Sequence, residues 1–257
     1  MASSKSPLKS KPLRNPGESA NEALQDLWMG KILSYFLMAG LFVALAALES
    51  LRWYIEAPIN PVLFIICAAI AVTVAVWKIR DEIKKSKCLA LGRDGEKAVG
   101  QFLEGLRESG AKVFHDIPGV GFNIDHVVIH STGIYVIETK TYSKPVRGDA
   151  RLIYDGETVT ANGFKPERNA IIQVRAASQW LVDLVQESTG MKFPVRAAVV
   201  YPGWFIESTA KAKLSDVWAL NPKALPSFIL NSKVTLKAEE VQLCAYHLGR
   251  YVRSSNK

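Results

Sequence analysis

Cysteine is scarce in this sequence, and no two cysteines have the spacing of a metal-binding or redox pair. Only Cys67, Cys88 and Cys244 occur among 257 residues, and none forms a CxxC motif. This scarcity argues against a disulfide framework and against a zinc site built from thiolates, and fits a reducing compartment.

The motifs of several common enzyme classes are also missing. No serine stands in a G-x-S-x-G setting, so a serine hydrolase has no support. The segment PGVGF contains glycines but no phosphate-binding helix follows it, which leaves a dinucleotide site unsupported. A secretory signal peptide is rejected because its apolar centre would be shorter and would not be followed at once by a second apolar run.

Acidic residues are outnumbered by basic ones, which give a formal net charge of +8. A basic protein is attracted to polyanions, and nucleic acid and anionic lipid head groups are the two simplest candidates. Charge alone does not choose between them.

The N-terminal third consists of a polar tail and two long apolar runs. Residues 1–26 are rich in Ser, Lys, Pro and Asn, and this composition predicts a disordered basic tail. Residues 32–48 and 58–77 carry no charge, and each run approaches the roughly 20 residues that cross a hydrocarbon core. With only residues 49–56 between them, the runs predict a transmembrane helical hairpin over residues 27–80. The runs are apolar all round, which disfavours a buried hairpin of a soluble protein.

The distribution of basic residues predicts the orientation of this hairpin. The connecting loop holds only Arg52, whereas lysines and arginines are concentrated outside the two runs. They are Lys5, Lys9, Lys11, Arg14 and Lys31 before the first run, and Lys78, Arg80, Lys84, Lys85 and Lys87 after the second. The positive-inside bias then places both termini and the soluble domain on the cytoplasmic side of the inner membrane, with interface anchors at Trp28, Trp53, Tyr54 and Trp77.

The rest of the chain has the pattern of an α/β domain. A charged segment with apolar residues at helical spacing, from Val99 to Leu106, predicts a helix that enters the domain. Three runs rich in Val, Ile and Tyr follow at 111–117, 123–130 and 134–140 and predict antiparallel strands. Further elements are expected as a hairpin at 151–160, a helix at 167–187, a strand at 195–201 and an amphipathic helix at 238–252. We therefore expect a mixed sheet flanked by helices.

An acid on one strand and an acid-x-lysine on the next form the most informative pattern in the sequence. Glu138 and Lys140 are two residues apart on a strand and so share one face. Asp125, on the preceding strand, lies opposite them if the STG turn closes with an even number of residues. A three-residue loop places Asp125 on the other face unless a bulge corrects the register.

Two neighbouring carboxylates on a sheet are stable mainly when a hard divalent cation lies between them. Mg²⁺ is the expected ion, with Mn²⁺ as its substitute, bound by Asp125, Glu138 and the carbonyl of Thr139. The metal would lower the pKa of a bound water and neutralise charge at a phosphorus centre. Lys140 would orient that water or stabilise the transition state.

Three segments make this pattern similar to a known family. They are GRDGEKAVGQFL from Gly92, NIDHVVIHSTGIYVIETK from Asn123, and Asn169 with Gln173. Together they resemble the nuclease-related domain (NERD) family of the PD-(D/E)XK, or restriction-endonuclease-like, superfamily over residues 88–205. Members often have proline after the last asparagine, where this chain has Ala170.

The resemblance implies a restriction-endonuclease-like fold and a role for each matching residue. Glu96 on the first helix would be an accessory acid, Asp125 and Glu138 metal ligands, and Lys140 the catalytic lysine. Gln173 on the following helix would complete the site. Residues 206–257 are expected to form a C-terminal helical extension that packs on this domain.

The sequence therefore predicts a membrane-anchored, metal-dependent nuclease that acts on DNA in preference to RNA. The alternative is a membrane-bound scaffold or sensor that binds nucleic acid or protein without cutting it, since a fold does not guarantee an activity. A third possibility is that the hairpin itself is the functional part.

Basic residues near the site are candidate phosphate contacts, and three aromatic residues are candidate base-stacking groups. The basic residues are Arg147, Arg151, Lys165, Arg168 and Arg175, and the aromatic residues are Tyr142, Phe164 and Trp204. Of the histidines, His126 and His130 are interpreted as packing or surface residues, and His115 and His247 as isolated.

Overall fold

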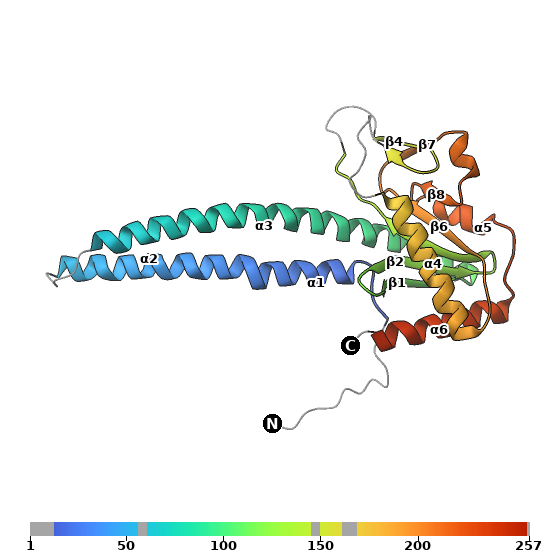
Figure 1. The fold of residues 1–257 in the computed structure, drawn as a ribbon, viewed down its shortest axis with the longest axis horizontal. Coiled ribbons are helices and arrows are strands. Elements are labelled where there is room, and N and C mark those ends of the chain that lie inside the picture. The colour runs from blue at the N-terminus through green and yellow to red at the C-terminus, as the bar shows by residue number, and fades with distance from the viewer. Residues whose placement is uncertain (1–12, 56–60, 145–149, 161–168, 256–257) are drawn as a thin grey trace, which may run out of the picture. The chain divides into compact units, whose positions relative to one another are not determined.

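The computed structural model describes residues 13–55, 61–144, 150–160 and 169–255 (Figure 1). The chain divides into two compact units, one formed by residues 19–91 and the other by residues 92–257 together with those before residue 19. The described residues of the first are almost all helical, and the second contains both sheets.

The helical unit begins with three consecutive segments, α1 (Glu18–Asp26), a π-helical stretch (Leu27–Ile32) and α2 (Leu33–Tyr54). Together they are the one helix, among the residues that the structure describes, that is long and apolar enough to cross a membrane. This criterion rests on length and composition, which a signal sequence or a buried core helix also meets. The second predicted span falls in α3 (Pro61–Glu104), and its first residues, 58–60, lie outside the described residues. A hydrogen bond of 3.0 Å from Trp28 Nε1 to Ser86 Oγ joins the first helix to α3.

The prediction of a disordered tail over residues 1–26 is wrong for its described part, because Glu18–Asp26 form α1. The Glu18 carboxylate accepts the backbone N–H of Asn15 at 2.7 Å, which fixes the chain just before the helix. An acidic residue in the first helical turn is also favoured by the helix dipole. Residues 1–12 lie outside the described residues.

A five-stranded mixed sheet forms the centre of the second unit, in the order β1-β2-β3-β6-β8. Strands β1 (Lys112–Pro118), β2 (Asn123–His130) and β3 (Gly133–Thr139) are antiparallel neighbours. Strand β6 (Val195–Val200) runs parallel to β3, and β8 (Val217–Leu220) runs parallel to β6. A smaller sheet has the order β5-β4-β7 and consists of β4 (Arg151–Tyr154), β5 (Val159–Thr160) and β7 (Phe205–Ser208).

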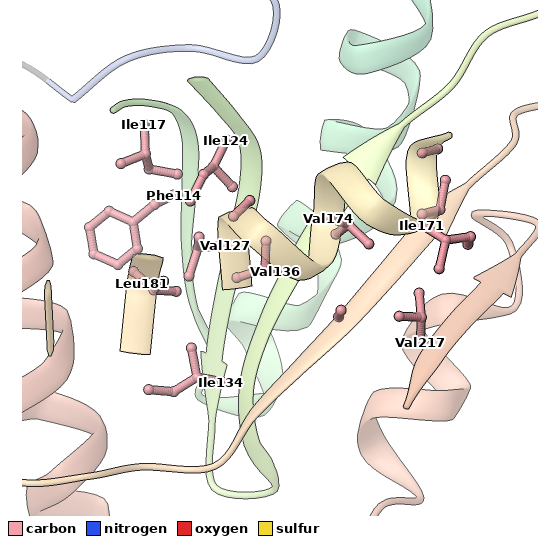
Figure 2. Close-up of a cluster of buried hydrophobic side chains, with 14 of the residues drawn as sticks. Phe114, Ile117, Ile124, Val127, Ile134, Val136, Ile171, Val174, Leu181 and Val217 are labelled. Atoms are coloured by element: carbon pink, nitrogen blue, oxygen red, sulfur yellow. The ribbon is translucent and has the colours of Figure 1, made fainter. Parts of the chain in front are cut away.

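Alternation of side chains along the strands produces two apolar cores, one on each face of the main sheet. Helices α4 (Ala170–Thr189) and α6 (Ala238–Ser255) cover one face, where Val127 and Val136 pack with Ile171, Val174 and Leu181 (Figure 2). We call this the α4 face. The other, the α3 face, is covered by the end of α3 and by α5 (Leu225–Leu230), which pack on residues such as Val128, Ile137 and Val200.

The predicted mixed sheet flanked by helices is confirmed, as are the hairpin at 151–160 and the helix at 238–252. The predicted helix at 167–187 appears as α4, and residues 161–168 lie outside the described residues. The predicted helical extension over 206–257 is wrong in its first part. There, β7 joins the small sheet and β8 joins the main sheet beside β6. Such short strands are specified by their pairing partners, and a run of four residues carries little periodicity of its own.

Candidate active site

A two-residue loop, Ser131–Thr132, joins β2 to β3 and sets the register of the proposed site. His130 pairs with Gly133 and His126 with Ile137, and the same register carried one pair further places Asp125 opposite Glu138. Gly133 has a φ of 141°, a conformation that favours glycine over other residues. The even-numbered loop that the site requires is therefore present, and both carboxylates lie on the α4 face.

Lys140 and Gln173 complete a chain of hydrogen bonds on this face. Lys140 Nζ donates to Glu138 Oε1 at 2.6 Å and to Gln173 Oε1 at 3.0 Å. Gln173 lies in the first turn of α4, whose N-cap is Asn169, with its side chain accepting the N–H of Ile171 at 2.9 Å. This cap starts the helix at Ala170 without the proline that is common there in the resembling family, so the helix still delivers Gln173 to the lysine.

Of the two central carboxyls, Glu138 is buried and Asp125 is half-buried, and burial is the largest cause of the pKa shift of each. Burial raises the pKa of Asp125, and the negative charges of Glu138 and Glu96 raise it further. The backbone N–H of Thr139 opposes this by donating to Asp125 Oδ2 at 2.6 Å. Glu138 is only 4% exposed, and burial raises its pKa against the opposing effect of Lys140. Lys140 therefore lies near two acids, of which Glu138 is buried and Asp125 is half-buried.

Glu96, on α3, lies near the carboxyls of Asp125 and Glu138. Burial, and then the charges of Asp116 and Glu138, raise its pKa from 4.5 to about 7. The preceding residue, Gly95, is buried so closely against the side chain of Thr141 that no β-carbon fits there. This close approach is what brings the helix, and with it Glu96, to the end of β3.

Asp116 is a fourth acid that the sequence reasoning missed. It lies on β1 between His115, which pairs with His126, and Ile117, which pairs with Ile124, so it is level with Asp125 on the next strand. Asp116 is 3% exposed and has a φ of 51°, which is uncommon for a residue with a side chain. Its position in the apolar run VFHDI was the available signal, because a carboxylate in such a run is costly without a partner. We call Glu96, Asp116, Asp125 and Glu138 the acid cluster.

The donor set of this site fits a hard divalent cation. Mg²⁺ takes oxygen ligands from one or two carboxylates and keeps several waters. Asp125 and Glu138 supply two such carboxylates, held at neighbouring positions with their charges only partly balanced by Lys140. Among the described residues, no group of three or more His, Cys, Asp or Glu side chains is already arranged around a possible metal position. Main-chain and water oxygens would therefore have to complete the coordination.

Several other predicted residues have structural partners. His115 is not isolated, since its Nδ1 lies 2.8 Å from His126 Nδ1 and its Nε2 lies 2.8 Å from a Glu104 oxygen. Trp204 is buried, and its indole N–H donates to the carbonyl of Tyr142, so it belongs to the core.

The predicted phosphate contacts are also engaged where they are described. Arg151 pairs with Glu207 at 2.9 Å, and Arg175 pairs with Glu157 and Asp216. Four further candidates lie outside the described residues, namely Arg147, Phe164, Lys165 and Arg168.

Comparison with protein families gives a match over the segment that contains most residues of the candidate site. Residues 91–202 match the family model for the nuclease-related domain, NERD. We call residues 91–202, which are similar to this family, the NERD segment. The NERD segment includes Glu96, the two central acids, Lys140 and Gln173, and ends just after β6. Arg14 and the residues around it lie outside the NERD segment.

Other comparisons add little. No curated protein matches the chain. Among solved structures, the chain is similar to "The structure of Pyrococcus Furiosus SfsA in complex with Ca2+", with 18% identity and a TM-score of 0.25. The match covers 48% of this chain and 52% of that one, so the chain spans about half the length of that protein.

Proposed function

We propose that this protein is a membrane-anchored, Mg²⁺-dependent nuclease that hydrolyses phosphodiester bonds, with DNA as the favoured substrate. The observation that carries the proposal is the placement of Asp125 and Glu138 side by side on one face of the sheet, with Glu138 buried, Asp125 half-buried and Lys140 as their near cation. Such an arrangement is unfavourable without a cation and becomes useful when one is bound.

Each side chain has a defined task in this proposal. Asp125 and Glu138 would hold the ion, which would supply Lewis-acid chemistry at the scissile phosphate. Lys140, fixed by Gln173, is placed to contact the attacking water or a phosphate oxygen. With its pKa near 7, Glu96 exchanges protons readily at neutral pH, as a general base requires.

The membrane part of the proposal rests on the helix Glu18–Tyr54 and on the apolar first half of α3. We propose that both cross the inner membrane, so that both termini and the nuclease-related domain face the cytoplasm. The positive-inside bias supports this orientation, because the basic residues flank the two apolar segments.

The test is cleavage of labelled single- and double-stranded DNA and RNA by the full chain in detergent micelles, with Mg²⁺, Mn²⁺ or EDTA. We expect cutting that EDTA abolishes and that Glu138→Gln and Lys140→Met each reduce by about a thousandfold, since both act where charge develops. Glu239→Gln and Lys192→Met are matched controls, because both residues are exposed and neither belongs to the site.

Two results would reject the enzyme. Absence of cutting by the folded chain would favour the binding scaffold, and binding of nucleic acid without cleavage would support that alternative directly. Equal activity in Glu138→Gln and Glu239→Gln would mean that any observed cutting comes from elsewhere. Cleavage of RNA in preference to DNA would correct the substrate and keep the chemistry.

A further inference from the structure

A short N-terminal segment, Leu13–Gly17, lies against the acid cluster although it precedes the matched domain by more than seventy residues of sequence. Arg14 Nε lies 2.8 Å from Asp116 Oδ2, and the two side chains are 12% and 4% exposed. The backbone N–H of Gly17 donates to the Glu96 carboxylate. The segment thus touches the two members of the cluster that come from β1 and α3.

The packing of this segment is specific. Pro16 lies so close to Gly100 on α3 that a β-carbon there would clash with the proline ring. Leu13 packs against the core on the α4 face. The segment is therefore built into the second unit by apolar contacts as well as by the ion pair, and its continuation at Glu18 is the start of the candidate membrane helix.

Asp116 links the segment to the central acids. Its second oxygen, Oδ1, accepts from Asn123 Nδ2 at 3.0 Å. Asn123 begins β2, two residues before Asp125. The ion pair and this hydrogen bond hold Asp116 in its unusual backbone conformation, and residues held in this way are found where structure is arranged for function.

We infer that Leu13–Gly17 is part of the active site, with Arg14 as a positioning residue that acts through Asp116. Arg14 fixes Asp116, and through Asn123 the start of β2, while Gly17 fixes Glu96. This inference rests on the proposed nuclease function for its catalytic consequence. Small displacements of a positioned carboxylate cost large factors in rate, which is why a residue without contact to substrate can matter.

The experiment uses the full chain in micelles and four variants, Arg14→Ala, Arg14→Lys, Asp116→Asn and the double variant Arg14→Ala/Asp116→Asn. Arg107→Ala is the matched control, because Arg107 also pairs with a carboxylate of this unit, Glu104, at 2.6 Å. For each protein the kcat and KM of cleavage are measured, together with the Kd of Mn²⁺ by electron paramagnetic resonance.

We expect Arg14→Ala to lower kcat at least tenfold with KM changed less than threefold, and Arg14→Lys to restore part of the loss. The double variant has the same net charge as the wild type, so it separates positioning from charge balance. Positioning predicts that it remains as slow as the single variants and binds Mn²⁺ at least fivefold more weakly than wild type.

Two results would overturn the inference. One is a kcat for Arg14→Ala within twofold of that for Arg107→Ala. The other is recovery of the wild-type kcat and Mn²⁺ Kd in the double variant, which would mean that Arg14 only neutralises the charge of Asp116. If the wild type cuts nothing, the proposed function fails, and the Mn²⁺ affinities then decide the inference alone. Equal Kd values for the double variant and wild type would reject it.

Discussion

The two faces of the central sheet carry buried polar groups at the same level, yet the groups differ in how completely they are partnered. On the α4 face, among the described residues, Lys140 is the cation near Asp125 and Glu138, and burial raises the pKa of both acids. On the α3 face, His126 lies between His115 and the Thr139 hydroxyl, at 2.8 and 3.3 Å.

The histidine group is internally satisfied. His115 also reaches Glu104, and burial lowers the pKa of both histidines, which favours their neutral forms. Neutral rings that exchange hydrogen bonds need nothing from outside, whereas clustered carboxylates need a cation. Of two neighbouring residues on one strand, Asp125 thus belongs to the candidate site and His126 to a structural network. Burial of a polar residue alone does not distinguish a candidate site from a structural network. The distinction is whether neighbouring groups satisfy its charge and hydrogen bonds.

The largest effect expected from this comparison is on stability, when Asp125 and His126 are changed one at a time. His126→Ala should lower the free energy of opening of β2 by about 2–4 kcal/mol, because it leaves a cavity and removes the partner of His115. Asp125→Asn, without metal and at pH 8, should cost nothing or stabilise, because it removes a repelling charge and keeps an acceptor for Thr139 N–H. Hydrogen exchange of the β2 and β3 amides measures the free energy of opening in both variants. Equal losses of stability in the two variants would contradict the proposed difference between the two faces.

A smaller effect is expected from the titration of Glu96. Its folded-state pKa is about 7 against an ordinary 4.5, so between these values the folded protein binds a proton that the unfolded chain has released. Stability without metal should therefore fall as the pH rises through this window, by about 1–3 kcal/mol in all.

The variant Glu96→Gln removes this titration, so its opening free energy in EDTA should vary less between pH 4.5 and 8 than that of the wild type. Glu239→Gln, at an exposed position, should keep the wild-type slope. Unchanged slopes in both variants would assign the pH dependence to another group.

The smallest effect should come from Arg175, whose ion pairs with Glu157 and Asp216 lie at the surface. We expect Arg175→Ala to cost less than about 1 kcal/mol, because exposed ion pairs contribute little. The salt dependence of nucleic-acid binding should also stay the same, since this arginine is already engaged. A reduced salt slope, measured by titration at several KCl concentrations, would return Arg175 to the list of phosphate contacts.

Sequence reasoning reached the site because its signals are local. Side-chain parity placed Glu138 and Lys140 on one face, whereas the position of Asp125 stayed conditional until the structure showed a two-residue loop at the STG turn. The metal, the catalytic roles and the membrane orientation stay predictions, since the geometry supports them without testing them.

What the sequence did not reveal depends on contacts between distant segments. Arg14 looked like one more charge in a polar tail, and only the fold brings it to Asp116. The conformation of Asp116 and the pairing of β8 with β6 likewise arise from tertiary contacts. Local propensity carries no information about such partners.

The loop Ser131–Thr132 limits how this chain can change in length. If the turn kept its two-residue form, an insertion of one residue there would invert every side chain of β2 relative to β3, so that His126 would come to lie on the face that now holds Glu138. An insertion of two residues would restore the phase and alter only the tip of the hairpin. Related chains that keep the acid pair are therefore expected to differ in this loop by even numbers of residues, or to carry a compensating bulge in one of the two strands.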